Sequence, residues 1–245
     1  MHQQLNLIRL STFKISKLRF LDGIKTIGGS NVGEKQQLIN AGHYLISNQL
    51  AWGTSGNISA RIDSNRMIIT ASGTYMANLG QDDFVDCQID TGQIEGTRKA
   101  SKETPMHLGI YRQRKDAKAI LHSSPFYTTL FSCSKEPILS ELFVETMYYL
   151  EDIAYVDYYH PGSQELAEAI TEQAPNANII IMRNHGVVVF DESVLEAQMR
   201  LETLEMACRM ILKAKESGVQ LKMIPEKTVQ SFLEDSHYKT RKKIN

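Results

Sequence analysis

Three side chains of this sequence, Glu103, His122 and His185, are of the types that bind divalent metal ions. His122 ends the apolar run in "AKAILHSS", His185 stands in "RNHG", and Glu103 lies in "SKETPMH". Two imidazoles and a carboxylate suit Zn²⁺ and other first-row divalent ions. Taken alone, each histidine is more often a packed core residue, and the acid a favourable contact with a helix dipole. The metal hypothesis therefore requires that the tertiary structure bring the three together.

Three short turns rich in small residues lie in the first half of the chain: "GTSGN", "ASGT" and "SKET". Glycine lets the backbone approach an anion closely while amides and hydroxyls donate hydrogen bonds to it. Lys102 adds an ammonium beside Ser101 that could pair with a phosphate. Each turn alone is more often structural. Neither a G-x-x-x-x-G-K-[ST] loop nor a G-x-G-x-x-G motif is present, so nucleotide binding is disfavoured.

Hydrophobic periodicity predicts the elements that must position these residues. Apolar residues at helical spacing predict helices, and short apolar runs bounded by polar turns predict strands. Thr104 and Pro105 are expected as the N-cap and first residue of one helix. The predicted order is a helix over "GEKQQLINAGHYLISNQL", strands in "GNISARI", "RMIITASG" and "DFVDCQID", a helix from Thr104 to about Arg114, a strand in "AKAILHSS", a helix over "SQELAEAITEQA", a hairpin over "ANIIIMRNHGVVVF" and a helix from Ser193 to Ser217.

This order lacks the regular βαβ alternation of a doubly wound sheet. It predicts a single-domain, mixed α/β sandwich in which a central, mainly antiparallel β-sheet is flanked by helices. The domain is expected to span residues 33–217. Residues 1–32, which end in "GGS" before the first helix, are expected to form an N-terminal extension, and residues 218–245 a C-terminal segment with a basic tail.

Composition narrows the classes of partner. The formal net charge is −1, so no overall field would draw the chain to nucleic acid or to an anionic membrane. No apolar run approaches the roughly 20 residues that span a bilayer, and a secretory signal is not evident, so we expect a cytoplasmic protein. The 3 cysteines are widely spaced without a C-x-x-C pair, and are expected to be buried thiols.

The motifs "GTSGN", "ASGT", "SKETPMH", "AILHSS" and "RNHG", in this order, resemble the class II aldolase/adducin family. The resemblance covers roughly residues 33–217 and implies that family's fold. It implies that Glu103 is the catalytic acid/base and that His122 and His185 bind the metal, with Zn²⁺ as the expected ion. It also implies a set of residues that bind a substrate phosphate: Gly56, Asn57, Ser72, Gly73, Ser101 and Lys102.

The sequence departs from the family pattern at Ser124. The usual H-x-H motif gives two ligands, and its second histidine falls on this serine, whose neutral hydroxyl is a poor ligand compared with an imidazole. Binding is therefore expected to be weaker or to favour a different metal. His160 is a less favoured substitute, because the resemblance places it in a loop where the family keeps no ligand. An assisting tyrosine is not identified, although Tyr148 and Tyr149 lie near the expected region.

The resemblance implies a metal-dependent aldehyde-lyase acting on a short sugar phosphate, with dihydroxyacetone phosphate as a shared product. Epimerisation and decarboxylation use related enolate chemistry and remain alternatives. A second class of function is a non-catalytic role in binding or assembly, as in the adducin branch, and Ser124 favours it. Family resemblance also implies a homotetramer.

Overall fold

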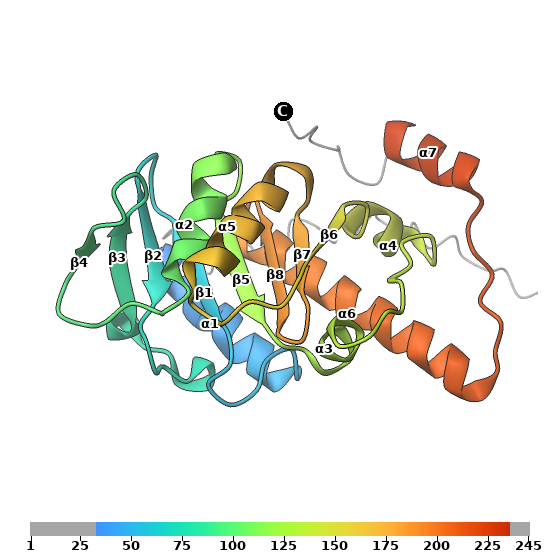
Figure 1. The fold of residues 1–245 in the computed structure, drawn as a ribbon, viewed down its shortest axis with the longest axis horizontal. Helices are drawn as coiled ribbons and strands as arrows, with labels where there is room; N and C mark the ends of the chain where they lie inside the picture. The colour runs from blue at the N-terminus through green and yellow to red at the C-terminus, as the bar shows by residue number, and fades with distance from the viewer. Residues whose placement is uncertain (1–32, 236–245) are drawn as a thin grey trace, which may run out of the picture. The chain divides into compact units, whose positions relative to one another are not determined.

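The protein is described by a computed structural model over residues 33–235. Its centre is a sheet in the order β4-β3-β2-β1-β5-β8-β7-β6, antiparallel throughout except for the parallel pair β6 and β7 (Figure 1). The strands are β1 (Asn57–Arg61), β2 (Arg66–Thr70), β3 (Phe84–Gln88), β4 (Ile94–Glu95), β5 (Ala119–Ser123), β6 (Ile153–Val156), β7 (Ile179–Met182) and β8 (Gly186–Asp191). The mixed α/β class with a mainly antiparallel sheet, predicted from the sequence, is confirmed.

Helices cover both faces of the sheet. One face packs against α2 (Thr104–Gln113) and α5 (Gln164–Gln173). The other face packs against α1 (Glu34–Ser47) and the long α6 (Val194–Ser217), with α3 (Phe126–Ser132) and α4 (Val144–Tyr149) beside α6. Alternate residues of each central strand therefore enter two different cores, so that β5 is buried along its whole length and β8 along all but its last residue.

The helices that the sequence predicted most clearly begin at side-chain caps. Ser163 accepts a hydrogen bond from the backbone N–H of Leu166 at the start of α5, and Ser193 accepts one from Glu196 at the start of α6. Gly218, with φ of 72°, ends α6 in a left-handed conformation. At α2 the prediction is off by one residue, because Glu103 is the N-cap and Thr104 is the first helical residue.

The α-helices and strands that were not predicted are β4, α3, α4, β6 and α7 (Glu226–Asp235). All of these except α7 have at most seven residues, too few to show a helical period or to separate a strand from a loop. The division into a domain at 33–217 and flanking segments stays a prediction. The predicted extension at 1–32 and the basic end of the tail lie outside the described residues.

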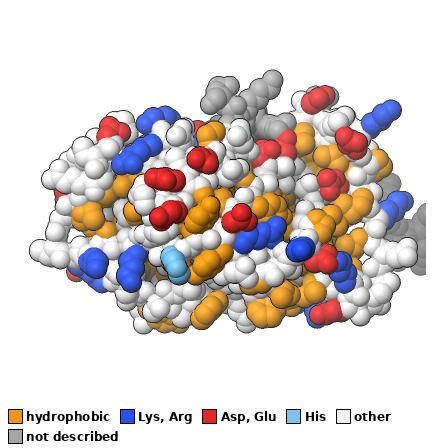
Figure 2. Space-filling model, viewed as in Figure 1, with side chains coloured by type: hydrophobic (Ala, Val, Ile, Leu, Met, Phe, Trp, Pro, Cys, Tyr) orange, Lys and Arg blue, Asp and Glu red, His pale blue; other side chains and the backbone are white. Residues whose placement is uncertain are grey.

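The distribution of charged side chains on the surface is consistent with a net charge near zero. Acidic and basic side chains are interspersed on the face shown in Figure 2, without a broad field of one sign. Within residues 33–235, the helices are all too short or too polar to cross a bilayer.

Candidate metal centre and its pocket

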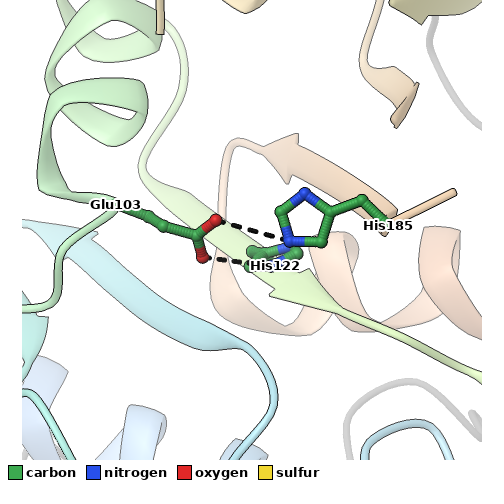
Figure 3. A group of neighbouring side chains, drawn as sticks. All are labelled: Glu103, His122 and His185. Atoms are coloured by element: carbon green, nitrogen blue, oxygen red, sulfur yellow. Dashed lines mark ion pairs between the residues drawn. The ribbon is translucent and has the colours of Figure 1, made fainter. Parts of the chain in front are cut away.

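Glu103, His122 and His185 converge although they come from three separate elements. Glu103 precedes α2, His122 is on β5, and His185 is in the turn between β7 and β8. Oxygen Oε2 of Glu103 lies 3.1 Å from Nε2 of His122, and Oε1 lies 3.5 Å from Nε2 of His185. The two imidazole rings meet edge to face, with centroids 5.0 Å apart (Figure 3). The structure thus brings together the three side chains that the sequence offered as metal ligands.

The pairing of β5 orients His122. In the sheet, His122 stands opposite Asn57 on β1 and Val188 on β8. Its Nδ1 lies 2.9 Å from the carbonyl oxygen of Val187. A carbonyl can only accept, so Nδ1 carries the proton and Nε2 is the nitrogen that faces Glu103. In known metal sites, a carbonyl that accepts the other ring N–H in this way fixes the orientation of the histidine ligand.

The turn that carries His185 approaches the end of β5 very closely. A Cβ added at Gly186 would lie 2.6 Å from the carbonyl oxygen of Ser123 and 2.8 Å from Oγ of Ser124. Asn184 occupies the left-handed region, with φ of 56°, which asparagine tolerates better than most residues. The "NHG" sequence therefore lets the turn fold tightly against β5, which sets His185 beside His122.

These residues fit a divalent cation. Their ligand atoms all lie within 4.8 Å of one another. Oxygen Oε1 of Glu103 and Nδ1 of His185 are buried without a hydrogen-bond partner among the described residues, which normally costs free energy. A cation between the three side chains would satisfy Oε1 of Glu103 and the Nε2 atoms of both histidines. The donor set of two nitrogens and one carboxylate suits Zn²⁺, Mn²⁺ or Co²⁺.

Burial and charge shift the three titrating groups in different directions. Burial would raise the pKa of Glu103, but the charge and hydrogen bond of His122, the amide of Asn57 and the charge of His185 together lower that pKa. The pKa of His122 is raised, since the charge of Glu103 and two hydrogen bonds outweigh burial. Burial, reinforced by the charge of His122, lowers the pKa of His185. The site thus favours an ionised carboxylate at Glu103 and a neutral imidazole at His185. At His122 it favours positive charge.

A pocket of about 380 Å³ opens above the three side chains. Glu103, His122 and His185 line it, and so do all six residues predicted to bind a phosphate: Gly56, Asn57, Ser72, Gly73, Ser101 and Lys102. Three turns and one ammonium thus converge on the same space beside the three candidate ligands, and turns of this kind can build an anion-binding site. The phosphate role of these residues remains a prediction.

Gly56 shows why one of these turns needs glycine. Its φ is 86°, and an added Cβ would lie 2.4 Å from the carbonyl oxygen of His122. The turn before β1 can therefore pass directly over the backbone of β5 only because this residue has no side chain. This contact places the "GTSGN" turn at the edge of the pocket.

Ser124 lines the pocket but has a structural partner. Its Oγ lies 3.3 Å from the backbone oxygen of His185 and donates to it, and its own carbonyl accepts a hydrogen bond of 3.1 Å from Nε1 of Trp52. Ser124 therefore ties the end of β5 to the His185 turn. His160 is exposed and lies beside Tyr158, outside the cluster of ligand atoms found among residues 33–235.

The two tyrosines considered as assisting groups do not line the pocket. Tyr149 is buried against α6, where its hydroxyl donates to Oε2 of Glu196 at 3.0 Å. Spacing along the chain offers no basis for choosing between Tyr148 and Tyr149, and neither lines this pocket within residues 33–235.

Sequence reasoning missed the role of two residues, His107 and the side chain of Asn57. The Asn57 amide donates to Oε2 of Glu103 at 2.7 Å, so the side chain holds the carboxylate directly. His107 is fully buried, with its ring bonded to Asn57 and Ser59. The signal available was the spacing of Glu103 and His107, one helical turn apart.

The chain is similar in sequence and in fold to members of one protein family. A family model described as Class II Aldolase and Adducin N-terminal domain matches residues 36–212. An L-fuculose phosphate aldolase of Methanocaldococcus jannaschii is 32% identical over 179 residues, which cover 73% of this chain and 96% of that protein. A 3-oxo-tetronate 4-phosphate decarboxylase of Haemophilus influenzae is 29% identical over 187 residues, covering 72% and 85%. A solved L-fuculose 1-phosphate aldolase superposes with a TM-score of 0.74 at 28% identity, covering 84% and 96%.

Proposed function

Because the chain belongs to the class II aldolase and adducin family, we propose that it is a divalent-metal-dependent aldehyde-lyase that cleaves or forms a carbon–carbon bond in a short sugar phosphate. The observation that carries this proposal is the convergence of Glu103, His122 and His185 on the floor of a pocket whose other side is made of anion-binding turns. Similarity to a named fuculose phosphate aldolase supports the choice of a sugar phosphate.

Each part of the pocket has a role in this reaction. The turns around Gly56, Ser72 and Ser101, with the ammonium of Lys102, hold the phosphate and so orient the carbon chain. A divalent ion held by the two histidines, with Zn²⁺ the expected species, would supply Lewis-acid stabilisation of the enediolate that bond cleavage creates. His122 and His185 would hold that ion beside the carboxylate of Glu103.

Glu103 is the group proposed to move the proton. Its Oε2 is held by Asn57 and faces His122, whereas Oε1 has no hydrogen bond within the described chain. When it is not bound to a cation, Oε1 is the atom available to carry a proton to or from the carbon at which the bond breaks. The lowered pKa of Glu103 keeps the side chain ionised before the reaction begins.

Two related reactions and one unrelated role compete with this proposal. Decarboxylation and epimerisation pass through the same enolate, and one relative is named as a decarboxylase. A role in binding or assembly alone would not require a buried carboxylate, a buried imidazole and a half-buried imidazole around one point, because unsatisfied polar groups are costly. Family resemblance suggests a homotetramer, and the exposed apolar side chains of Trp52, Phe126 and Met206 are compatible with subunit contacts.

The decisive experiment measures metal and product together. The protein is purified from cells supplied with zinc, manganese and cobalt, its metal content is determined, and it is incubated with a panel of ketose 1-phosphates and 3-oxo acid phosphates. We expect bound divalent metal and release of dihydroxyacetone phosphate, lost on chelation and restored by the metal. Release of CO₂ or of an epimer would favour the related reactions, and protein without divalent metal or turnover would contradict the proposal.

Replacing Ser124 by histidine tests whether the missing imidazole weakens the site. In known metal sites, loss of a residue that only hydrogen-bonds a ligand weakens metal affinity by 10–100-fold. Since Ser124→His adds a ligand, we expect it to tighten metal binding by at least about tenfold. The measurement is a competitive titration against a chelating dye. Ser124→Ala is the matched control and should leave the affinity within about threefold. Equal affinities in Ser124→His and wild type would mean that position 124 does not reach the ion.

A further inference from the structure

Behind Glu103 lies a buried ladder of polar side chains that joins α2 to β1. Glu103, His107 and Tyr111 lie on one stripe of α2, at intervals of one helical turn. Asn57 and Ser59 lie on one face of β1. Four residues of helix and two residues of strand both advance by about 6 to 7 Å, so the stripes match in length. This match allows successive rungs of hydrogen bonds between the two elements.

The hydrogen bonds of the ladder have a single consistent direction. Asn57 Nδ2 donates to Oε2 of Glu103 at 2.7 Å, which leaves the Asn57 Oδ1 as an acceptor facing Nε2 of His107 at 2.6 Å. His107 must therefore carry its proton on Nε2 and accept at Nδ1. Oγ of Ser59 lies 2.7 Å from that Nδ1 and 3.0 Å from the hydroxyl of Tyr111. Ser59 thus donates to His107, and Tyr111 donates to Ser59.

Burial restricts these hydrogen bonds to the partners named above. His107, Ser59 and Tyr111 are each 0% exposed, so water cannot replace a rung. Burial lowers the pKa of His107 to about 3, which keeps the ring neutral and compatible with one proton on Nε2. Reversing the Asn57 amide would set its carbonyl against the Glu103 carboxylate and its NH₂ group against the Nε2–H of His107. Both contacts would be unfavourable, so the Glu103 carboxylate sets the orientation of the Asn57 amide, and His107, by donating from Nε2, holds the amide in that orientation.

Resting on the proposed function, we propose that His107 is a positioning residue of the reaction. Through Asn57 it holds Oε2 of Glu103 in place and leaves Oε1 directed at the reacting atoms, while Ser59 and Tyr111 complete the hydrogen bonds on the other side of its ring. A ladder needed only for stability could be apolar, because well-packed hydrophobic groups replace buried polar networks at little cost. The polar ladder begins at the acid/base and runs inward from it, which is where positioning is required.

The test compares two replacements of His107. His107→Gln keeps an N–H near the position of Nε2, whereas His107→Leu removes the donor and keeps a similar volume. Loss of a residue that supports a ligand through a hydrogen bond typically changes activity by 10–100-fold. We therefore expect kcat to fall by about 10–100-fold in His107→Leu, with KM changed less than threefold. In His107→Gln we expect kcat to recover largely. Ile110→Val on the same helix is the packing control and should keep kcat within about twofold. A folded His107→Leu variant with wild-type kcat would overturn the proposal.

A double-mutant cycle shows whether the effect passes through Glu103. We expect His107→Leu to weaken Zn²⁺ binding by about tenfold in the wild-type background and not at all in Glu103→Ala, because coupled residues are non-additive. An equal effect in both backgrounds would overturn the proposal, and this measurement needs no turnover, so it stays informative if the lyase assay fails. If no metal binds, ¹⁵N spectroscopy of the metal-free chain decides: a proton on Nε2 of His107 supports the ladder, and one on Nδ1 overturns it.

Discussion

Glu103→Gln is expected to lower kcat by about 10²–10⁴-fold, the usual contribution of a general acid/base. Glutamine keeps the size of the side chain and an oxygen that can accept a hydrogen bond from Asn57. In the wild-type protein, Nδ2 of Asn57 donates to Oε2 of Glu103 at 2.7 Å. It removes the ability to take up and release a proton. The change therefore separates proton transfer from positioning. The measurement is steady-state release of dihydroxyacetone phosphate by metal-loaded protein.

The control for this variant is Glu168→Gln on α5, an exposed site with the same chemical change. It should retain wild-type kcat and the wild-type midpoint of thermal unfolding. Unchanged turnover in Glu103→Gln would remove Glu103 from the mechanism even if the metal site were intact. A fall in kcat accompanied by complete loss of metal would instead assign Glu103 mainly as a ligand, so metal content is measured on the same samples.

His122→Ala is expected to abolish stoichiometric metal binding and to lower the metal affinity by at least about 100-fold. Loss of a residue that only hydrogen-bonds a ligand already costs 10–100-fold, and loss of the ligand itself should cost more. Turnover should fall below detection. The variant also leaves the Val187 carbonyl without its 2.9 Å partner, so we expect the free energy of unfolding to decrease by about 1–3 kcal/mol. Metal analysis, calorimetric titration with Zn²⁺ and urea denaturation give the three quantities.

His43→Ala is the matched control, because His43 is an exposed histidine on α1. It should change neither metal content nor stability. If His122→Ala does not fold, His185→Ala provides the same test at a more exposed side chain, whose exposed fraction is 15% against 2% for His122. Full metal content in a folded variant of either histidine would show that the ion is held elsewhere.

The elements of this fold could be predicted where their patterns are long or strongly capped. The helices α1, α5 and α6, and the hairpin of β7 and β8, have periodic apolar residues and clear boundaries such as Ser163 and Ser193. The short segments around α3, α4 and β6 carry too few residues for any period to be distinguished. Their conformation depends on tertiary packing, as when Glu205 of α6 accepts hydrogen bonds from the backbone of Tyr127 and Thr128.

By itself, the sequence determined which side chains were available for chemistry and which turns could approach an anion. Residue type dictates ligand preference, and glycine dictates where the backbone can come close. Only the tertiary structure decided that Glu103, His122 and His185 meet, because their convergence depends on the pairing of β5 with β1 and β8. The same pairing set Asn57 beside His122, and the packing of α2 on β1 placed His107 behind Asn57. Contacts between distant segments leave no local pattern in the sequence. The spacing of residues along the chain therefore showed neither that the three candidate ligands meet nor that Asn57 and His107 support Glu103.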